Sequence, residues 1–188
     1  MKVNHRLGLR IRDLRKAKAM NISELARKID RSVGWVSQIE RGKSAVTISA
    51  LNQIAAALEV RVSWFFDAGA PPAPEEEGLV VRQADRRTLD FHGSGVHEEM
   101  LSPHLHGALL LVETTFEPGA TTGDRDRERR GEEAGLVLSG TLELRVEGLV
   151  LKLQAGDSFN FTRQGPHRCH NPGDIPCRVL WVITPPSY

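Results

Sequence analysis

The first third of the chain has the apolar spacing of amphipathic helices. Apolar residues recur at i, i+4 and i+7 in one stretch and at i, i+3, i+4 and i+7 in another: Leu7, Ile11 and Leu14, then Leu51, Ile54, Ala55 and Leu58. This spacing places them on one face of a helix, where they can pack against a core. We therefore expect a helical domain at the start of the chain.

Two short helices are predicted between these stretches. Asn21 is a candidate N-cap with Glu24 three residues later, the spacing of a capping box, and its helix covers residues 22 to about 29. Ser32 caps a second helix over residues 33 to about 41, and the glycine after it stands in the C′ position. Two short helices joined by a tight turn are typical of the helix-turn-helix motif, whose second helix enters the major groove of DNA.

Short apolar runs separated by Gly, Pro, Asn and Asp follow residue 78. Six runs are predicted strands: 108–116, 136–138, 142–146, 149–153, 158–161 and 178–183. Strands of this length and spacing favour a β-sandwich or a β-barrel.

The segment 68–78 separates the two patterns. It contains three prolines, two glycines and three glutamates, a composition that cannot build a packed element and indicates a semi-extended linker. We predict a multi-domain α + β chain with a DNA-binding domain over residues 1–67 and a second domain over residues 79–188.

The charge is distributed unevenly between these parts. Residues 1–67 contain 13 Lys and Arg against 6 Asp and Glu, whereas residues 68–188 contain 12 against 18, although the whole chain carries only +1. A basic first part and an acidic remainder indicate that the N-terminal domain alone meets a polyanion such as DNA.

The composition otherwise fits a globular protein, with 40% hydrophobic and 26% charged residues. No apolar run approaches the roughly 18 residues of a membrane span, and no apolar segment of a secretory signal follows the first residues. The two cysteines, Cys169 and Cys177, are expected to be strand or core thiols, which favours a cytoplasmic location.

The second predicted helix carries the candidate base contacts. Gln38 can bond adenine through two hydrogen bonds, and Val33 can touch a thymine methyl group. Gly34 lets the backbone approach DNA closely. Trp35 has two interpretations that stay open here: a contact to base or phosphate, or a core or dimer contact.

Residues 7–66 resemble the lambda-repressor-like (XRE-type) DNA-binding domain, on Leu25-Ala26, on Val36-Ser37-Gln38-Ile39-Glu40-Arg41-Gly42 and on the apolar series that ends at Leu58. The resemblance implies five helices, a buried ion pair between Arg15 and Glu40, and phosphate contacts. Where many members have a proline before the fourth helix, this chain has Thr47 as the expected cap. The predicted DNA-binding residues are Asn21, Ser32, Val33, Gly34, Trp35, Ser37, Gln38, Lys43 and Ser44.

Residues 108–188 resemble the cupins, on Gly131-Glu132-Glu133 to Gly140 and on Ala155-Gly156-Asp157 to Gly173. The resemblance implies a small double-stranded β-helix barrel. Glu133 and His167 match two metal-ligand positions of cupin enzymes, but Asp-Arg-Glu-Arg stands at 126–129, where His-x-His is expected, and arginine is not an ordinary metal ligand.

We therefore predict no catalytic residue, no metal and no cofactor. The alternative of a metal-dependent cupin enzyme with a DNA-binding head stays open, because Asp126 or Glu128 can in principle replace a histidine. His104-Leu105-His106 has metal-like spacing but is expected to be a solvated turn.

The barrel interior is the predicted effector site. Its candidate residues are Arg129, Glu133, Val137, Phe159, Phe161, His167 and Trp181. The whole arrangement, with Pro118-Gly119-Ala120-Thr121-Thr122-Gly123, resembles the family of bacterial putrescine-catabolism repressors, which implies polyamine or amino-acid-derived effectors. An acidic site suits a polyamine, whereas four arginines between 125 and 130 favour an anionic or zwitterionic ligand, and both alternatives stay open.

The sequence thus predicts a DNA-binding transcriptional regulator, a repressor, that acts as a homodimer on a double-stranded operator and responds to a small molecule. A cupin enzyme and an antitoxin-like interaction module are the alternatives. We expect no membrane partner and no enzymatic activity.

Overall fold

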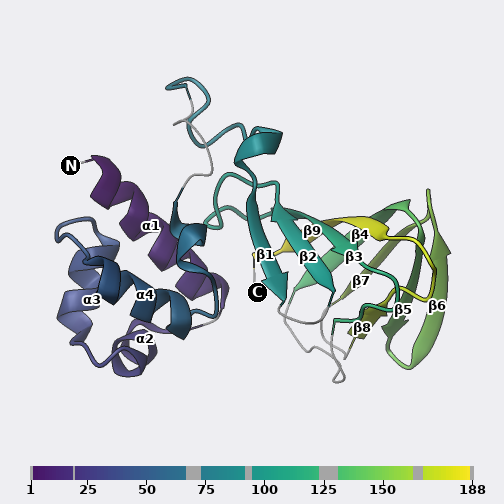
Figure 1. The fold of residues 1–188 in the computed structure, drawn as a ribbon, viewed down its shortest axis with the longest axis horizontal. Helices are drawn as coiled ribbons and strands as arrows, with labels where there is room; N and C mark the ends of the chain where they lie inside the picture. Colours follow the sequence, from purple (N-terminus) through teal and green to yellow (C-terminus); the bar gives the residue numbers. More distant parts are fainter. Residues whose placement is uncertain are drawn as a thin grey trace. The chain divides into compact units, whose positions relative to one another are not determined.

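The computed structural model describes residues 2–18, 20–66, 73–91, 95–122, 131–162 and 167–186. The chain forms two compact units (Figure 1). The first contains Met1–Asp85, Pro103–His106 and Ser187–Tyr188, and the second contains Arg86–Ser102 and Gly107–Pro186. Because the first unit extends past the predicted linker, the boundary at residues 68–78 stays a prediction.

The described part of the first unit contains four α-helices and two short 3-10 helices. The α-helices are α1 (Lys2–Ala17), α2 (Ile22–Lys28), α3 (Val33–Glu40) and α4 (Ile48–Ala57), and the 3-10 helices are η1 (Val62–Phe65) and η2 (Gln83–Asp85). The predicted fifth helix is therefore a four-residue 3-10 helix. Its N-terminus has no side-chain cap, and four residues complete little more than one turn.

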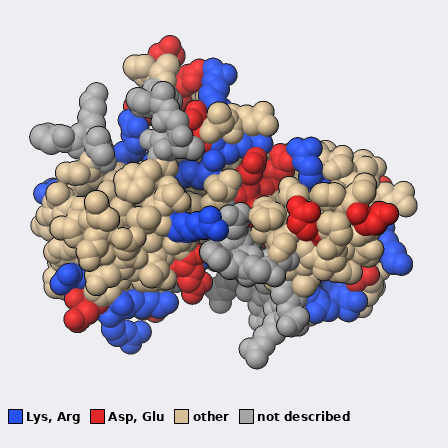
Figure 2. Space-filling model, in the orientation of Figure 1, with Lys and Arg blue, Asp and Glu red and all other residues tan. Residues whose placement is uncertain are grey.

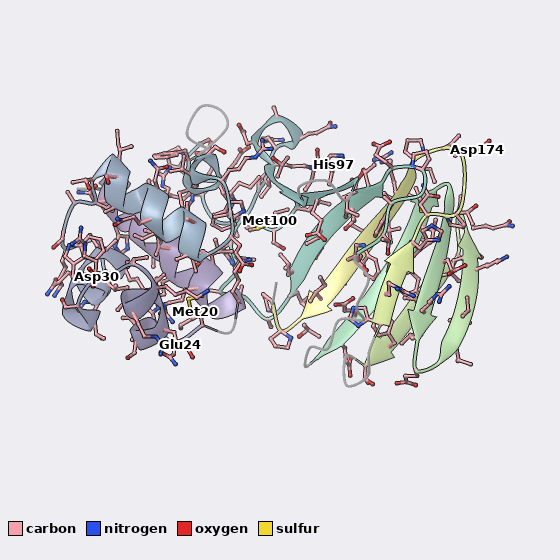
Figure 3. The ribbon with its side chains drawn as sticks, turned by 60° about the horizontal axis from the view of Figure 1, so that its bottom comes forward. Met20, Glu24, Asp30, His97, Met100 and Asp174 are labelled. Carbon is pink, nitrogen blue, oxygen red and sulfur yellow. The ribbon has the colours of Figure 1, made fainter. Side chains whose placement is uncertain are left out.

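Side-chain caps define where three of these helices begin. The Asn21 side chain accepts a hydrogen bond from the Glu24 amide at 2.9 Å, and the Glu24 carboxylate accepts one from the Asn21 amide at 2.7 Å. The predicted capping box is thus confirmed, and Figure 3 shows Glu24 in the first turn of α2. Ser32 caps α3 and Thr47 caps α4, because each side-chain oxygen accepts a hydrogen bond from the backbone amide three residues later.

Most of the helical core consists of apolar residues that the sequence spacing selects: Ile11, Leu14, Leu25, Ile39, Ile54 and Leu58 are buried, whereas Leu7 is half-buried. Phe65 of η1 is buried as well and was not predicted. Their burial is the main source of stability for the unit, at about 1.5–3 kcal/mol for each large apolar side chain.

Two glycines allow α1 and α3 to approach closely. A Cβ atom at Gly8 of α1 would lie 2.3 Å from the carbonyl oxygen of Ile39 at the end of α3. A Cβ atom at Gly42 would lie 2.5 Å from Cα of His5, and Gly42 also has a positive φ of 65°. Gly42 therefore ends α3, as predicted, and makes room for α1 as well.

The described part of the second unit contains nine antiparallel strands: β1 (Arg87–Phe91), β2 (Val96–Met100), β3 (Leu110–Phe116), β4 (Glu132–Ser139), β5 (Thr141–Val146), β6 (Leu149–Gln154), β7 (Ser158–Thr162), β8 (His167–His170) and β9 (Cys177–Thr184). They form a six-stranded sheet, β1-β2-β3-β9-β4-β7, and a three-stranded sheet, β6-β5-β8 (Figure 1). The predicted fold of a helix-turn-helix unit followed by a cupin barrel is confirmed.

Three strands escape sequence prediction. β2 reads Val-His-Glu-Glu-Met, with charged residues between two buried ends, and β8 reads His-Arg-Cys-His. β1 is similarly interrupted by polar residues. None of them contains an apolar run that the sequence pattern could reveal. They are strands because they pair with neighbouring strands.

Both cysteines are buried thiols in strands, as predicted: Cys169 in β8 and Cys177 in β9. Burial raises the pKa of the Cys177 thiol to about 11.

The His104-x-His106 segment is only partly as predicted. The segment has no regular secondary structure, but Leu105 is buried and Nδ1 of His106 lies 3.0 Å from the Asp13 carboxylate. The expectation of a solvated turn is therefore wrong for Leu105, whose apolar side chain is buried.

No helix among the described residues is long and apolar enough to cross a membrane.

The close approach at Gly8 is testable by adding one methyl group. Gly8→Ala is expected to lower the free energy of unfolding by about 1–3 kcal/mol, because its Cβ overlaps a backbone carbonyl that cannot move aside cheaply. Gly34→Ala is the matched control. Its Cβ would meet only Ser32 Oγ, at 3.9 Å, so helix propensity should raise stability by about 0.5–1 kcal/mol.

Urea denaturation followed by circular dichroism at 222 nm measures both variants. Equal stability of the two would contradict the close packing of α1 on α3.

Candidate DNA-binding surface and effector site

Helix α3 has one buried face and one open face. Val36, Ile39 and Glu40 are buried, whereas Gly34 and Gln38, one helical turn apart, are exposed. Val33, at the start of the helix, is 44% exposed. The predicted base-reading residues therefore share the open side of this helix, with their backbone held by the Ser32 cap.

Trp35 lies at the edge of this open face. Its side chain is half-buried, and the guanidinium of Arg31 lies 5.7 Å from its ring centroid, which is the geometry of a cation–π contact. The indole is thus positioned by contacts within the unit and still has accessible surface. Its predicted contact with DNA stays a prediction.

The predicted phosphate-contacting residues surround α2 and α3. The side chains of Asn21 and Ser32 already accept amide hydrogen bonds as caps, Lys43 is exposed, and Ser37 and Ser44 are half-buried. Figure 2 shows Lys and Arg side chains, with some Asp and Glu, at the end of the helical unit where α2 and α3 lie.

Two further cations belong to this surface and were not predicted individually. Arg31 and Arg41 flank α3 and are exposed. The excess of positive charge in residues 1–67 includes both, and Arg41 also belongs to the motif that carries the family resemblance.

A buried ion pair anchors the closed face of α3. Arg15 Nε donates to Glu40 Oε1 at 2.6 Å and Arg15 Nη2 donates to Oε2 at 2.8 Å, so the structure brings together the two residues that the family resemblance pairs. Arg15 Nη1 also donates to the Met20 carbonyl at 2.8 Å, just before α2. One guanidinium therefore ties the end of α3 to the turn that precedes α2.

The candidate effector site begins on β4. Glu133, Gly135 and Val137 alternate inward and are buried, while Leu136 and Leu138 point to the outer face and are partly exposed. Alternation along the strand therefore carries a carboxylate into an otherwise apolar interior.

Aromatic side chains flank β4 on both sides. Gly135 lies opposite Phe159 of β7 and opposite Trp181 of β9. Because a Cβ at Gly135 would come within 2.2 Å of the Phe159 ring, only glycine lets this ring lie over the strand, 5.1 Å from the Trp181 ring in an edge-to-face arrangement. Gly135 was not among the predicted site residues.

Two ionisable side chains meet beside these rings. His167 Nε2 lies 3.9 Å from Glu133 Oε2, both residues are about 6% exposed, and the His167 ring centroid is 5.0 Å from that of Phe161. Phe161 lies opposite Glu133 in the strand register. Of the predicted effector residues, the structure thus gathers Glu133, Val137, Phe159, Phe161, His167 and Trp181.

The described donors do not fit a resident cupin metal. No three His, Cys, Asp or Glu side chains come together within the ranges that the structure describes, and Glu133 with His167 supplies two donors. Two donors make a weak site. Asp126, Glu128 and the predicted effector residue Arg129 lie outside the described residues.

Comparison with known proteins agrees with both units. A "Helix-turn-helix domain" family model matches residues 6–62, and a "Cupin domain" model matches residues 112–183. The HTH-type transcriptional regulator PuuR of Escherichia coli K12 is 28% identical over 96% of each chain. The HTH-type transcriptional regulator SutR of the same bacterium is 25% identical over 89% of this chain and 88% of its own.

The chain thus contains a helix-turn-helix domain and a cupin domain, and it is similar along nearly its whole length to HTH-type transcriptional regulators.

Solved structures share the fold of this regulator. The crystal structure of FeII HppE is 17% identical, with a TM-score of 0.50, and the match covers 96% of this chain and 99% of that one. At this level of identity the likeness shows the fold alone.

The buried ion pair of the regulator gives a clear stability test. Glu40→Ala removes the carboxylate that accepts both of these hydrogen bonds and leaves the Arg15 guanidinium in a buried position, so the free energy of unfolding should fall by about 3–5 kcal/mol. Arg15→Met/Glu40→Leu removes both charges and should recover most of that loss. Chemical denaturation of the full chain measures the cycle; a double variant no more stable than Glu40→Ala would contradict the pairing.

Proposed function

We propose that this regulator is a homodimeric repressor without enzymatic activity, which reads a palindromic operator through α3 and senses an amine-bearing small molecule in its cupin barrel. The observation that carries the proposal is the buried carboxylate of Glu133 among aromatic rings, in a barrel whose described donors do not fit a metal. A buried ionisable group beside aromatic rings suits ligand recognition.

The DNA part of the proposal rests on the open face of α3. Gln38 is exposed there and has the paired donor and acceptor that recognise adenine in the major groove. Gly34, one turn earlier, leaves space for the helix to approach bases. Two copies on a palindrome would place their α3 helices about 34–36 Å apart, or a multiple of that distance.

Gln38→Ala tests the readout. Loss of a bidentate base contact should weaken operator binding by about 1–3 kcal/mol and relax the preference for one base pair. Gln53→Ala, which removes an exposed glutamine from α4, is the control and should leave binding unchanged.

Gel shifts against the upstream DNA of the regulator's own gene and a scrambled fragment measure both properties. If Gln38→Ala binds with wild-type affinity and preference, Gln38 does not read the operator.

The effector part rests on the electrostatics of the barrel. A buried carboxylate is stabilised by positive charge beside it, and His167 Nε2 already lies 3.9 Å from Glu133 Oε2. A ligand ammonium group would bring further positive charge to the same carboxylate. The faces of the Phe159, Phe161 and Trp181 rings are also negative, so they attract ammonium groups. Polyamines and amino-acid derivatives share an ammonium group, and we therefore propose that Glu133 binds this group.

The Glu133 carboxylate separates a cationic ligand from an anionic one. Glu133→Gln keeps the size of the side chain but removes its charge, and should weaken binding of putrescine or spermidine about 10- to 100-fold, the loss of one charge-assisted hydrogen bond. Glu132→Gln is the matched control, because its side chain is the exposed neighbour on the same strand.

Isothermal titration calorimetry with putrescine, spermidine and succinate measures the effect. Binding of succinate that improves in Glu133→Gln, with no binding of either amine to the wild type, would contradict an ammonium site.

Regulation then requires only that the amine bind two arrangements of the dimer with different affinities. An amine that binds more tightly to the arrangement of the two DNA-binding domains that does not fit the operator shifts the population toward that arrangement. DNA affinity then falls by the same factor by which operator DNA weakens amine binding.

A further inference from the structure

Strand β6 is an edge strand with uncovered apolar side chains. It pairs with β5 and lies at the end of the three-stranded sheet, so the described residues leave its other edge without a partner strand. Leu149 is 59% exposed, Val150 54% and Leu151 38%. Three consecutive apolar residues are thus open to solvent along an open row of backbone groups.

The exposed leucines continue the core of the barrel. Leu149, Leu151 and Leu153 lie on one face of β6, opposite Val146, Leu144 and Leu142 of β5 in the strand register. The three β5 residues are buried, at 7%, 1% and 0% exposure. The apolar layer therefore does not stop at β5 but runs on into β6, where the described residues leave it exposed.

The edge lacks the usual protection against pairing. Natural edge strands carry proline, several charges or bulges that prevent another chain from adding to them. β6 contains no proline and a single charge, Lys152. By contrast, the exposed residues of β7, an edge strand of the six-stranded sheet, are Ser158, Asn160 and Thr162, which are polar.

We propose that β6 pairs antiparallel with β6 of a second copy of this chain, joining the two three-stranded sheets into one. This inference rests on the proposed homodimeric function and names the surface that holds the dimer together. A two-fold axis through Leu151 places Leu151 opposite the partner subunit's Leu151 and Leu149 opposite the partner subunit's Leu153, so the leucine row matches itself.

The charge pattern agrees with this self-pairing. In that register Lys152 lies opposite the partner subunit's Val150, so the two lysines do not face each other directly. The backbone groups of both edges become hydrogen-bonded, and the leucine side chains of the two strands pack beside each other across the new pair. The same strand can supply both sides of this interface because an antiparallel pair of identical strands is symmetric.

A charge at the centre of the row tests the surface. Leu151→Lys should raise the dimer dissociation constant at least about 10-fold, since two buried lysines would face each other. Leu138→Lys is the control: Leu138 of β4 is 39% exposed, almost the same as Leu151, but lies on a different sheet. Sedimentation of the full chain over a concentration series measures both variants.

A disulfide cross-link provides a second test of the interface if Leu151→Lys folds poorly. Leu151→Cys places two thiols opposite each other on the two-fold axis and should give a disulfide-linked dimer on mild oxidation, whereas Leu138→Cys should not. The natural cysteines, Cys169 and Cys177, are buried and should not react.

The outcomes separate the two proposals. A wild-type dimer that persists in Leu151→Lys, with no cross-link in Leu151→Cys, overturns the β6 interface but leaves the homodimer standing. A wild-type chain that is monomeric at every concentration overturns the homodimer itself, and the interface with it.

Discussion

The bidentate ion pair between Arg15 and Glu40 is the constraint on which the DNA-binding unit depends. Both side chains are buried, so each charge is tolerable only with the other in place. Because Gly8 lets α1 reach the end of α3 and the same Arg15 holds the Met20 carbonyl, three elements are fixed at one point. The direction of the open face of α3, with Gly34 and Gln38, follows from that arrangement.

In the barrel, the alternation of side chains along a strand positions the residues of the candidate site. A single strand, β4, sends Glu133 and Gly135 inward, and the missing side chain of Gly135 lets Phe159 and Trp181 come together next to the carboxylate. The site is thus assembled from neighbouring strands of one sheet, and His167 of the other sheet completes it. Such a site depends on the register of three strand pairs, and a shift by one residue would turn Glu133 out of the barrel.

Local signals explain what could be predicted from the sequence. The caps at Asn21, Ser32 and Thr47 act within three residues, and the apolar runs of β5, β6 and β9 alternate in their own sequence, so both are readable without a structure. β2 and β8 are strands because of their neighbours, and their polar sequences conceal this.

Long-range contacts account for what the residues alone could not give. Arg15 and Glu40 are 25 positions apart, and only a family resemblance paired them. Gly8 looks unfavourable in a helix until the close approach of Ile39 is known, and Gly135 looks like any strand glycine until the rings across it are placed. The importance of these glycines depends on partners that spacing does not reveal.

The raised pKa of Cys177 has a consequence for the reactivity of its thiol. With a pKa of about 11, only about one thiol in ten thousand is ionised at neutral pH, and peroxides attack the ionised form. Cys177 is therefore a poor target for oxidation by peroxides, so its place in β9 is that of a packed apolar side chain rather than a reactive thiol.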